Sequence, residues 1–173
     1  MNKTLLSTAL VAVVAAIGFI PTAQAAGGTI NITGKVLSDT CIVAVNNGST
    51  VVLPVVMTSA LGSVGAVAGA TSFNVDLTGC DANTTSATMA FSGGSINTGT
   101  GNLNNTAPSG SNVQIQLLNG ASVINTSNNT NAPVIAVSSG TGSASLKAQY
   151  IAATAAATAG LVSASVNFTL TYL

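Results

Sequence analysis

The sequence predicts an all-β protein, built as an antiparallel sandwich or barrel. Short strand-like runs recur along the chain, and stretches rich in Gly, Asn, Ser and Thr separate them. No helical period of useful length competes with these runs. The expected strands cover residues 29–45, 50–56, 72–77, 87–91, 112–118, 133–137, 143–150 and 161–172.

Residues 1–25 have the layout of a secretory signal peptide. Lys3 is basic, a mostly apolar stretch follows to Ile20, and Ala23-Gln24-Ala25 supplies a small-residue cleavage site. A membrane anchor is the alternative, but the stretch is interrupted by polar residues and is shorter than the ~20 apolar residues that a span needs. We therefore expect an exported protein that begins at Ala26, with no insertion into the membrane after cleavage.

The first strand-like run after the signal alternates in character. Ile30, Ile32 and Val36 are apolar, and Asn31, Thr33 and Lys35 stand between them. Such alternation predicts a strand that buries one face.

The turns between the expected strands are marked by residues that favour tight backbone geometry. They are Asn47-Gly48, Gly93-Gly94, Asn119-Gly120 and the polar tracts 97–110 and 125–131. The alanine-rich run 152–159 has high helix propensity, but Thr154 and Thr158 interrupt it and Gly160 ends it without a charged face. We expect this run to be a loop.

The last run alternates like the first. Val166, Phe168, Leu170 and Tyr172 are apolar, polar residues lie between them, and Leu173 follows. Two half-buried strands therefore bracket the domain. We expect the chain to lend one of them to a neighbour and to borrow a neighbour's strand beside the other.

Cys41 and Cys80 are the two cysteines of the chain. Export places them in an oxidising compartment, where two thiols in one small domain most often pair. A metal site is the alternative, but two thiolates without histidine or an acidic cluster do not complete a tetrahedral set.

The charge of the chain excludes several functions. Its formal net charge is zero, and after the signal it carries only two lysines and three aspartates, so it cannot hold nucleic acid or an anionic membrane surface by electrostatics. His, Glu, Arg and Trp are absent, which disfavours an enzyme. Neither Lys35 nor Lys147 lies in an S-x-x-K motif, and Asp76 and Asp81 are too few ligands for calcium, so turn capping is the preferred interpretation of these carboxylates.

Four stretches together resemble the type 1 fimbrial major subunits of the chaperone-usher class. They are Gly27-Gly28-Thr29-Ile30-Asn31-Ile32-Thr33-Gly34-Lys35-Val36 before Cys41, Phe73-Asn74-Val75-Asp76-Leu77-Thr78-Gly79-Cys80, Leu146-Lys147-Ala148-Gln149-Tyr150, and 164–172 with Tyr172 next to the end. The resemblance runs from the signal to the last residue. It implies a pilin domain over 35–173, with an immunoglobulin-like sandwich that lacks its last strand and is completed by a donor strand.

The resemblance also implies partners and site residues. A periplasmic chaperone first lends a strand and contacts Leu173, and at an outer-membrane usher the extension 26–34 of another pilin subunit replaces it. The protein would thus be a structural subunit of a surface fimbrium without a cofactor. The donor face would be Gly28, Ile30, Ile32 and Gly34, and the acceptor groove and chaperone contact would be Val166, Phe168, Leu170, Tyr172 and Leu173.

The length of the donor extension departs from this resemblance. Cleavage after Ala25 leaves only Ala26 and Gly27 before Gly28, whereas the resemblance implies a longer arm with a further pocket-filling residue upstream. Cleavage after Ala16 would add Ile20. Alternatives to the fibre subunit are a minor or tip pilin that acts as a binding module, a secreted enzyme, and a self-complemented or amyloid-forming matrix protein.

Overall fold

The computed structural model describes residues 31–34, 36, 41–46, 48 and 50–173. The expected signal 1–25 and the predicted donor positions Gly28 and Ile30 lie outside the described residues. The chain divides into two compact units, Met1–Lys35 and Val36–Leu173. The fold described below is that of the second unit.

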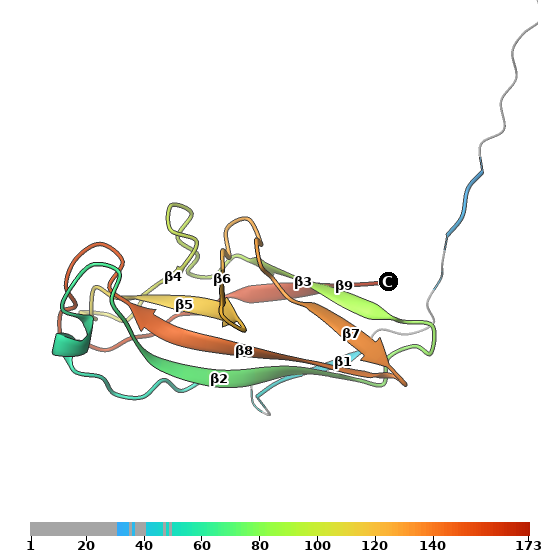
Figure 1. Cartoon of the computed structure of the whole chain (residues 1–173), viewed down its shortest axis with the longest axis horizontal. Coiled ribbons are helices and arrows are strands. Elements are labelled where there is room, and N and C mark those ends of the chain that lie inside the picture. The colour runs from blue at the N-terminus through green and yellow to red at the C-terminus, as the bar shows by residue number, and fades with distance from the viewer. Residues whose placement is uncertain (1–30, 35, 37–40, 47, 49) are drawn as a thin grey trace, which may run out of the picture. The chain divides into compact units, whose positions relative to one another are not determined.

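The second unit consists of nine strands and one short 3-10 helix within its described residues (Figure 1). In chain order they are β1 (Ile42–Val45), η1 (Thr58–Leu61), β2 (Val67–Thr78), β3 (Ser86–Ser92), β4 (Leu103–Asn104), β5 (Gln114–Asn119), β6 (Ser122–Ile124), β7 (Val134–Ser138), β8 (Thr141–Ile151) and β9 (Asn167–Tyr172). The expected all-β fold is confirmed.

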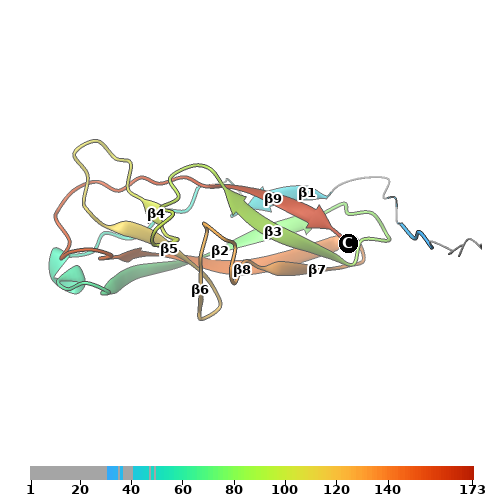
Figure 2. The same cartoon turned by 90° about the horizontal axis from the view of Figure 1, so that it is seen from above.

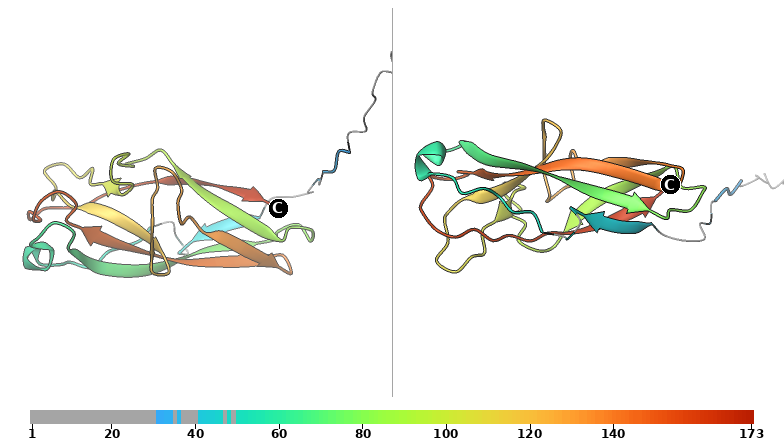
Figure 3. Two further views of the ribbon diagram at one scale, coloured as in Figure 1. Left: turned by 45° about the horizontal axis from the view of Figure 1, so that its top comes forward. Right: turned by 90° about the horizontal axis from the view of Figure 1, so that it is seen from below.

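The strands follow one continuous order, β1-β2-β8-β7-β3-β9, and every pair is antiparallel. β5 pairs with β8 on its other side and carries β4 and β6. Figures 2 and 3 show β3 and β9 in one layer and β2 and β8 in the other, with β7 joining them. The order therefore ends in two strands, β1 and β9, that each have a neighbour on one side.

Alternate residues of the long strands fill the space between the layers. On β2, Phe73, Val75 and Leu77 are buried, and on β3 Met89 and Phe91 face them, as the two-residue period of a strand requires. The completely buried side chains come from both layers and include Leu77, Met89, Ile135 and Leu146. These residues form one core cluster.

Three expected strands differ from the structure. Of the described residues within 29–45, only Ile42–Val45 form a strand, whereas 31–34 and 36 are exposed and lie in no strand. Residues 50–56 form no strand, and of 161–172 only Asn167–Tyr172 is one. A β-strand is defined by backbone hydrogen bonds to a neighbouring strand. Residues 51–56 form no backbone hydrogen bond to any other described residue. β4, β6 and η1 were not expected. Residues 152–159 form the expected loop.

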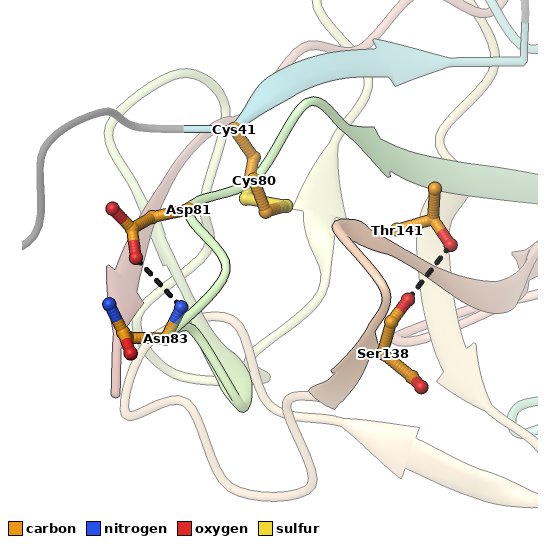
Figure 4. The surroundings of a disulfide bond; sticks show 6 residues. All are labelled: Cys41, Cys80, Asp81, Asn83, Ser138 and Thr141. Atoms are coloured by element: carbon orange, nitrogen blue, oxygen red, sulfur yellow. Dashed lines mark hydrogen bonds between the residues drawn. A yellow bond between two sulfur atoms is a disulfide. The ribbon is translucent and has the colours of Figure 1, made fainter.

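The predicted disulfide between Cys41 and Cys80 is confirmed (Figure 4). It ties the start of β1 to the turn that follows β2. The same view shows Asp81 accepting a 2.7 Å hydrogen bond from the backbone N–H of Asn83, which is the turn-capping role expected of this carboxylate. The other carboxylate, Asp76, accepts a 2.6 Å bond from the hydroxyl of Ser143.

Replacing both cysteines with serine is expected to destabilise the domain by about 4 kcal/mol. The bond closes a loop between residues 39 positions apart. Closing a loop of this length lowers the entropy of the denatured chain, and the loss of that constraint accounts for the expected destabilisation. Denaturant unfolding of the oxidised protein and the double variant measures the difference. A loss below about 1 kcal/mol would contradict the prediction.

Gly69 allows the long strand β2 to bend. It lies at a register shift between Ala68 and Thr71 with φ +69°, and a Cβ there would meet the ring of Tyr150 at 2.9 Å. Gly65 has a similar φ of +86° but open space around it, so it is a matched control. Gly65→Ala is expected to cost about 1–2 kcal/mol for the backbone alone. Gly69→Ala should cost about 1–3 kcal/mol more because of the collision, as measured by denaturant unfolding. Equal losses would contradict this.

Candidate functional site

A groove runs along the domain between the segment 50–58 and the segment 157–168. Its larger part is a cavity of about 610 Å³. One wall is formed by 50–53 and the other by 162–166 with Phe168. Its floor consists of core residues, including Phe73, Val75, Met89, Phe91, Leu117 and Leu146. The groove therefore opens onto the core between the two layers.

The smaller part of the groove is a second cavity of about 540 Å³. Residues 55–58 form one side, 157–162 form the other, and Leu61 and Val113 lie between them. Tyr150 and Val162 line both cavities, which are thus neighbours along one groove.

The lining of the groove is uncharged and mostly apolar. Burial raises the pKa of Tyr150 above its ordinary value, so its ring is neutral at any physiological pH. An occupant therefore needs apolar side chains, and a charged one would lose hydration without finding a partner.

The groove wall formed by residues 161–166 is hydrogen-bonded through its odd-numbered residues. These bonds lie on the side of the segment that faces away from the groove. The carbonyls of Leu161, Ser163 and Ser165 accept bonds from the N–H groups of Ser111, Thr106 and Ser95 at 3.1, 2.8 and 2.8 Å. The N–H groups of Ser163 and Ser165 donate to the side chains of Asn105 and Ser95. The wall is thus fixed along one edge only.

The same parity continues through β9. Leu173 and Ser86 exchange bonds in both directions, at 2.9 and 3.3 Å. Since bonded pairs alternate in an antiparallel ladder, the register of β3 and β9 makes 171, 169 and 167 the next residues bonded to β3. The backbone N–H and C=O groups of the odd-numbered residues from 161 to 173 thus all point away from the groove.

The even-numbered residues present their backbone to the groove. Val162, Ala164 and Val166 form no hydrogen bond with a described residue through N–H or C=O, and β9 pairs with no described strand other than β3. The opposite wall, 51–56, is likewise unpaired among the described residues. The site therefore offers two unsatisfied backbone edges above an apolar floor, which are the features that an added β-strand can satisfy.

The structure places the predicted acceptor residues as follows. Val166 and Phe168 line the groove. Leu170 and Tyr172 are half-buried on the same face and pack against the core beyond the cavity. Leu173 is exposed, and its carbonyl accepts bonds from the backbone and hydroxyl of Thr85. The assignment of these residues to an acceptor groove stays a prediction.

Of the predicted donor positions, Ile32 and Gly34 are described, and Ile32 is 89% exposed. Val36, the next apolar residue in phase with it, is 93% exposed. Both side chains are thus accessible in the single chain, and their burial would be favourable wherever an apolar groove receives them.

Sequence reasoning did not assign the opposite wall to the groove, nor the second cavity with Val56, Leu61 and Val113. A signal existed for the wall: Val51, Val52 and Leu53 are apolar, and Pro54 follows. A proline there indicates an edge rather than a central strand.

Other kinds of site find little support in the described part of the chain. No three His, Cys, Asp or Glu side chains gather there as metal ligands would. None of its helices has the length and apolar character of a membrane span. Every buried side-chain polar atom in this part has a hydrogen-bond partner, so none is left directed at a ligand.

Comparison with known proteins gives concordant results. A family model described as "Fimbrial protein" matches residues 30–173. The chain is 39% identical over 169 residues to the major fimbrial subunit SMF-1 of Stenotrophomonas maltophilia (strain K279a), covering 87% of this chain and 95% of that one. It is 35% identical over 155 residues to the type-1 fimbrial protein, A chain, of Escherichia coli (strain K12), covering 84% of each. Among solved structures, the P pilus rod subunit PapA matches with a TM-score of 0.62 at 20% identity, over 78% of this chain and all of that one.

Proposed function

The chain belongs to the fimbrial protein family, and from this we propose that it is a structural subunit of a chaperone-usher fimbrium that polymerises by donor-strand exchange. Proteins of this family are exported to the cell surface as components of fimbriae, and this chain is one of them. Donor-strand complementation of pilins is an established form of β-augmentation. The observation that carries the proposal is the unpaired even-numbered edge above an open core.

The proposed occupant of the groove is the extension of a second copy. Every strand pair in the described domain is antiparallel, so an added strand continues the sheet best in that direction. Directly opposed residues share a face, so even donor residues lie opposite even acceptor residues with their side chains on the core.

The lengths of donor and acceptor agree in one register. With Val36 opposite Val162, Ile32 lies opposite Val166 and Ile30 opposite Phe168. The eleven residues 26–36 then cover the whole open edge 162–172, from the expected first residue Ala26 to the smaller cavity. In this arrangement the third large apolar residue is downstream, at Val36, and no longer arm is needed upstream.

Insertion of the arm into the groove would release enough free energy to hold two subunits together stably. Burying an aliphatic side chain contributes about 1.5–3 kcal/mol, so Ile30, Ile32 and Val36 together contribute roughly 5–9 kcal/mol. Ladder hydrogen bonds add about 1 kcal/mol each. Gly28 and Gly34 let the strand approach the floor closely.

A peptide of residues 26–36 tests the proposal with a variant that lacks 26–34. The arm belongs to the other compact unit, so this deletion removes no residue of the domain. We expect the peptide to bind and to raise the thermal midpoint. The control peptide exchanges Ile30 with Asn31 and Ile32 with Thr33, which keeps the composition but reverses the faces. Equal binding of both peptides would contradict donor-strand pairing.

The chaperone and the usher are proposed as partners on the same surface. Before assembly a chaperone strand would occupy this edge, with its contact at Leu173, and exchange at the usher would follow. A minor or tip subunit is the alternative role. Quantitation of subunits in purified fimbriae distinguishes the two, since a major subunit makes up most of the fibre mass.

A further inference from the structure

The two ends of the domain carry different features. In Figure 1, η1 lies at one end, and the turn between β7 and β8 lies at the other. The η1 end consists of 55–66 and 155–161, held together by bonds such as that from the N–H of Ala157 to the carbonyl of Leu61. The disulfide end contains Cys41 to Val43 and the turns bonded through Cys80 and Gly140.

The η1 end exposes an apolar surface that is separate from the groove floor. Val55 is 98% exposed, Met57 74% and Leu161 75%, and Val64 is exposed nearby. None of the residues at this end is charged. Val55, Met57 and Leu161 form the rim of the smaller cavity, whereas Val56 and Leu61 lie deeper. We define the four exposed residues as the rim patch.

The disulfide end has an apolar feature of its own. Ile42 is 69% exposed on β1, and Val43 beside it is exposed as well. Ile42 packs only loosely against Gly79, where an added Cβ would still be 3.7 Å from its side chain. The disulfide links this strand end to the turn at Cys80.

The length of the chain brings these two surfaces together in the proposed fibre. If Val36 of one copy lies opposite Val162 of the next, Cys41 of the first copy is five residues away. Five residues span at most about 18 Å. Val162 lines the smaller cavity together with Val55, Met57 and Leu161. Cys41 of the donor copy therefore lies within about 18 Å of Val162 of the acceptor copy, at the end of the groove that carries the rim patch.

We propose that the rim patch binds the Cys41–Val43 region of the copy whose arm it has received. This second contact lies at the rim of the groove and sets the angle between successive subunits. It rests on the proposed function, because the inserted arm is what holds the two ends close. Both surfaces are apolar and exposed in the single chain, and each would be covered by the other.

Photo-crosslinking in assembled fibres tests this contact. A photoreactive phenylalanine analogue is placed at Met57, and in a matched variant at Val123, an exposed residue of β6 away from both ends. We expect Met57 to give a subunit-to-subunit product mapped by mass spectrometry to residues 41–45, and Val123 to give none there. Products from Met57 that include none within residues 41–45, or no product in intact fibres, would overturn the inference.

A second variant gives a mechanical readout. Ile42→Ser with Val64→Ser changes one residue of each surface and none that lines either cavity, so it should leave the affinity for the 26–36 peptide within about twofold but make fibres bend more in electron micrographs. Val123→Ser with Val134→Ser is the control and should not change bending. Unchanged bending in the first variant would contradict the second contact but not the proposed function. If the domain with unchanged surfaces does not bind the 26–36 peptide, the proposed function is contradicted as well.

Discussion

Replacing Ile30 and Ile32 with serine is expected to abolish fibre formation without affecting the fold of the domain. Each isoleucine contributes about 1.5–3 kcal/mol on burial, so the pair contributes roughly 3–6 kcal/mol. At about 1.4 kcal/mol per tenfold, the affinity of the arm for the groove should fall at least 100-fold. Electron microscopy of surface filaments and titration of the variant 26–36 peptide measure the two effects.

The matched control uses the residues between the isoleucines. Asn31→Ser with Thr33→Ser changes the outward face of the same arm and should leave both filaments and peptide affinity nearly unchanged. Filaments of normal length from the isoleucine variant would refute the donor role of this face. An equal loss from both variants would show that the face of the strand does not matter.

Proline at Ala164 is expected to block strand uptake while leaving the isolated domain folded. The N–H of Ala164 donates to no described residue, so proline removes no hydrogen bond from the part of the subunit that the structure describes. In the fibre the same position would lose a ladder bond, and the proline ring would project toward the incoming strand. We expect the affinity for the 26–36 peptide to fall by at least tenfold.

The neighbouring residue provides the control for this variant. The N–H of Ser165 donates to the hydroxyl of Ser95 at 2.9 Å, so Ser165→Pro should reduce the stability of the domain by about 1–3 kcal/mol. Thermal unfolding and peptide titration are measured for both variants. If Ala164→Pro destabilises the domain as much as Ser165→Pro while peptide affinity is unchanged, the even-numbered edge is not the acceptor.

The strand faces of this fold could be predicted from the sequence, because alternation is a local property. The pattern of Val166, Phe168, Leu170 and Tyr172 indicated the buried face of β9 correctly. Which edge of β9 is free could not be predicted in the same way. That depends on its pairing with β3, which is about 80 residues earlier in the chain.

The segment 50–56 shows where local reasoning is insufficient. Its apolar residues predict a strand, and alternate ones such as Val51 and Leu53 do pack on the core. It is not a strand because it has no ladder partner among the described residues. The proposed donor would supply that partner, so the mistaken element lies at the candidate site.

The groove floor was also beyond sequence reasoning. Phe73, Met89, Leu117 and Leu146 come from four different strands and meet only through the curled order of the sheet. Each of them alone has the pattern of an ordinary core residue. Only the arrangement in space shows that this part of the core is open.

Hydrogen exchange of the backbone amides from 162 to 173 tests the central claim most directly. In the domain without its arm, the amides of Val162, Ala164, Val166, Phe168, Leu170 and Tyr172 should exchange rapidly, while those of the odd-numbered residues 163–173 are protected. On addition of the 26–36 peptide, the even-numbered amides should become protected and the odd-numbered ones should change little. Even-numbered amides that are already protected in the single domain, or that still exchange rapidly with the peptide bound, would contradict an edge completed by another subunit.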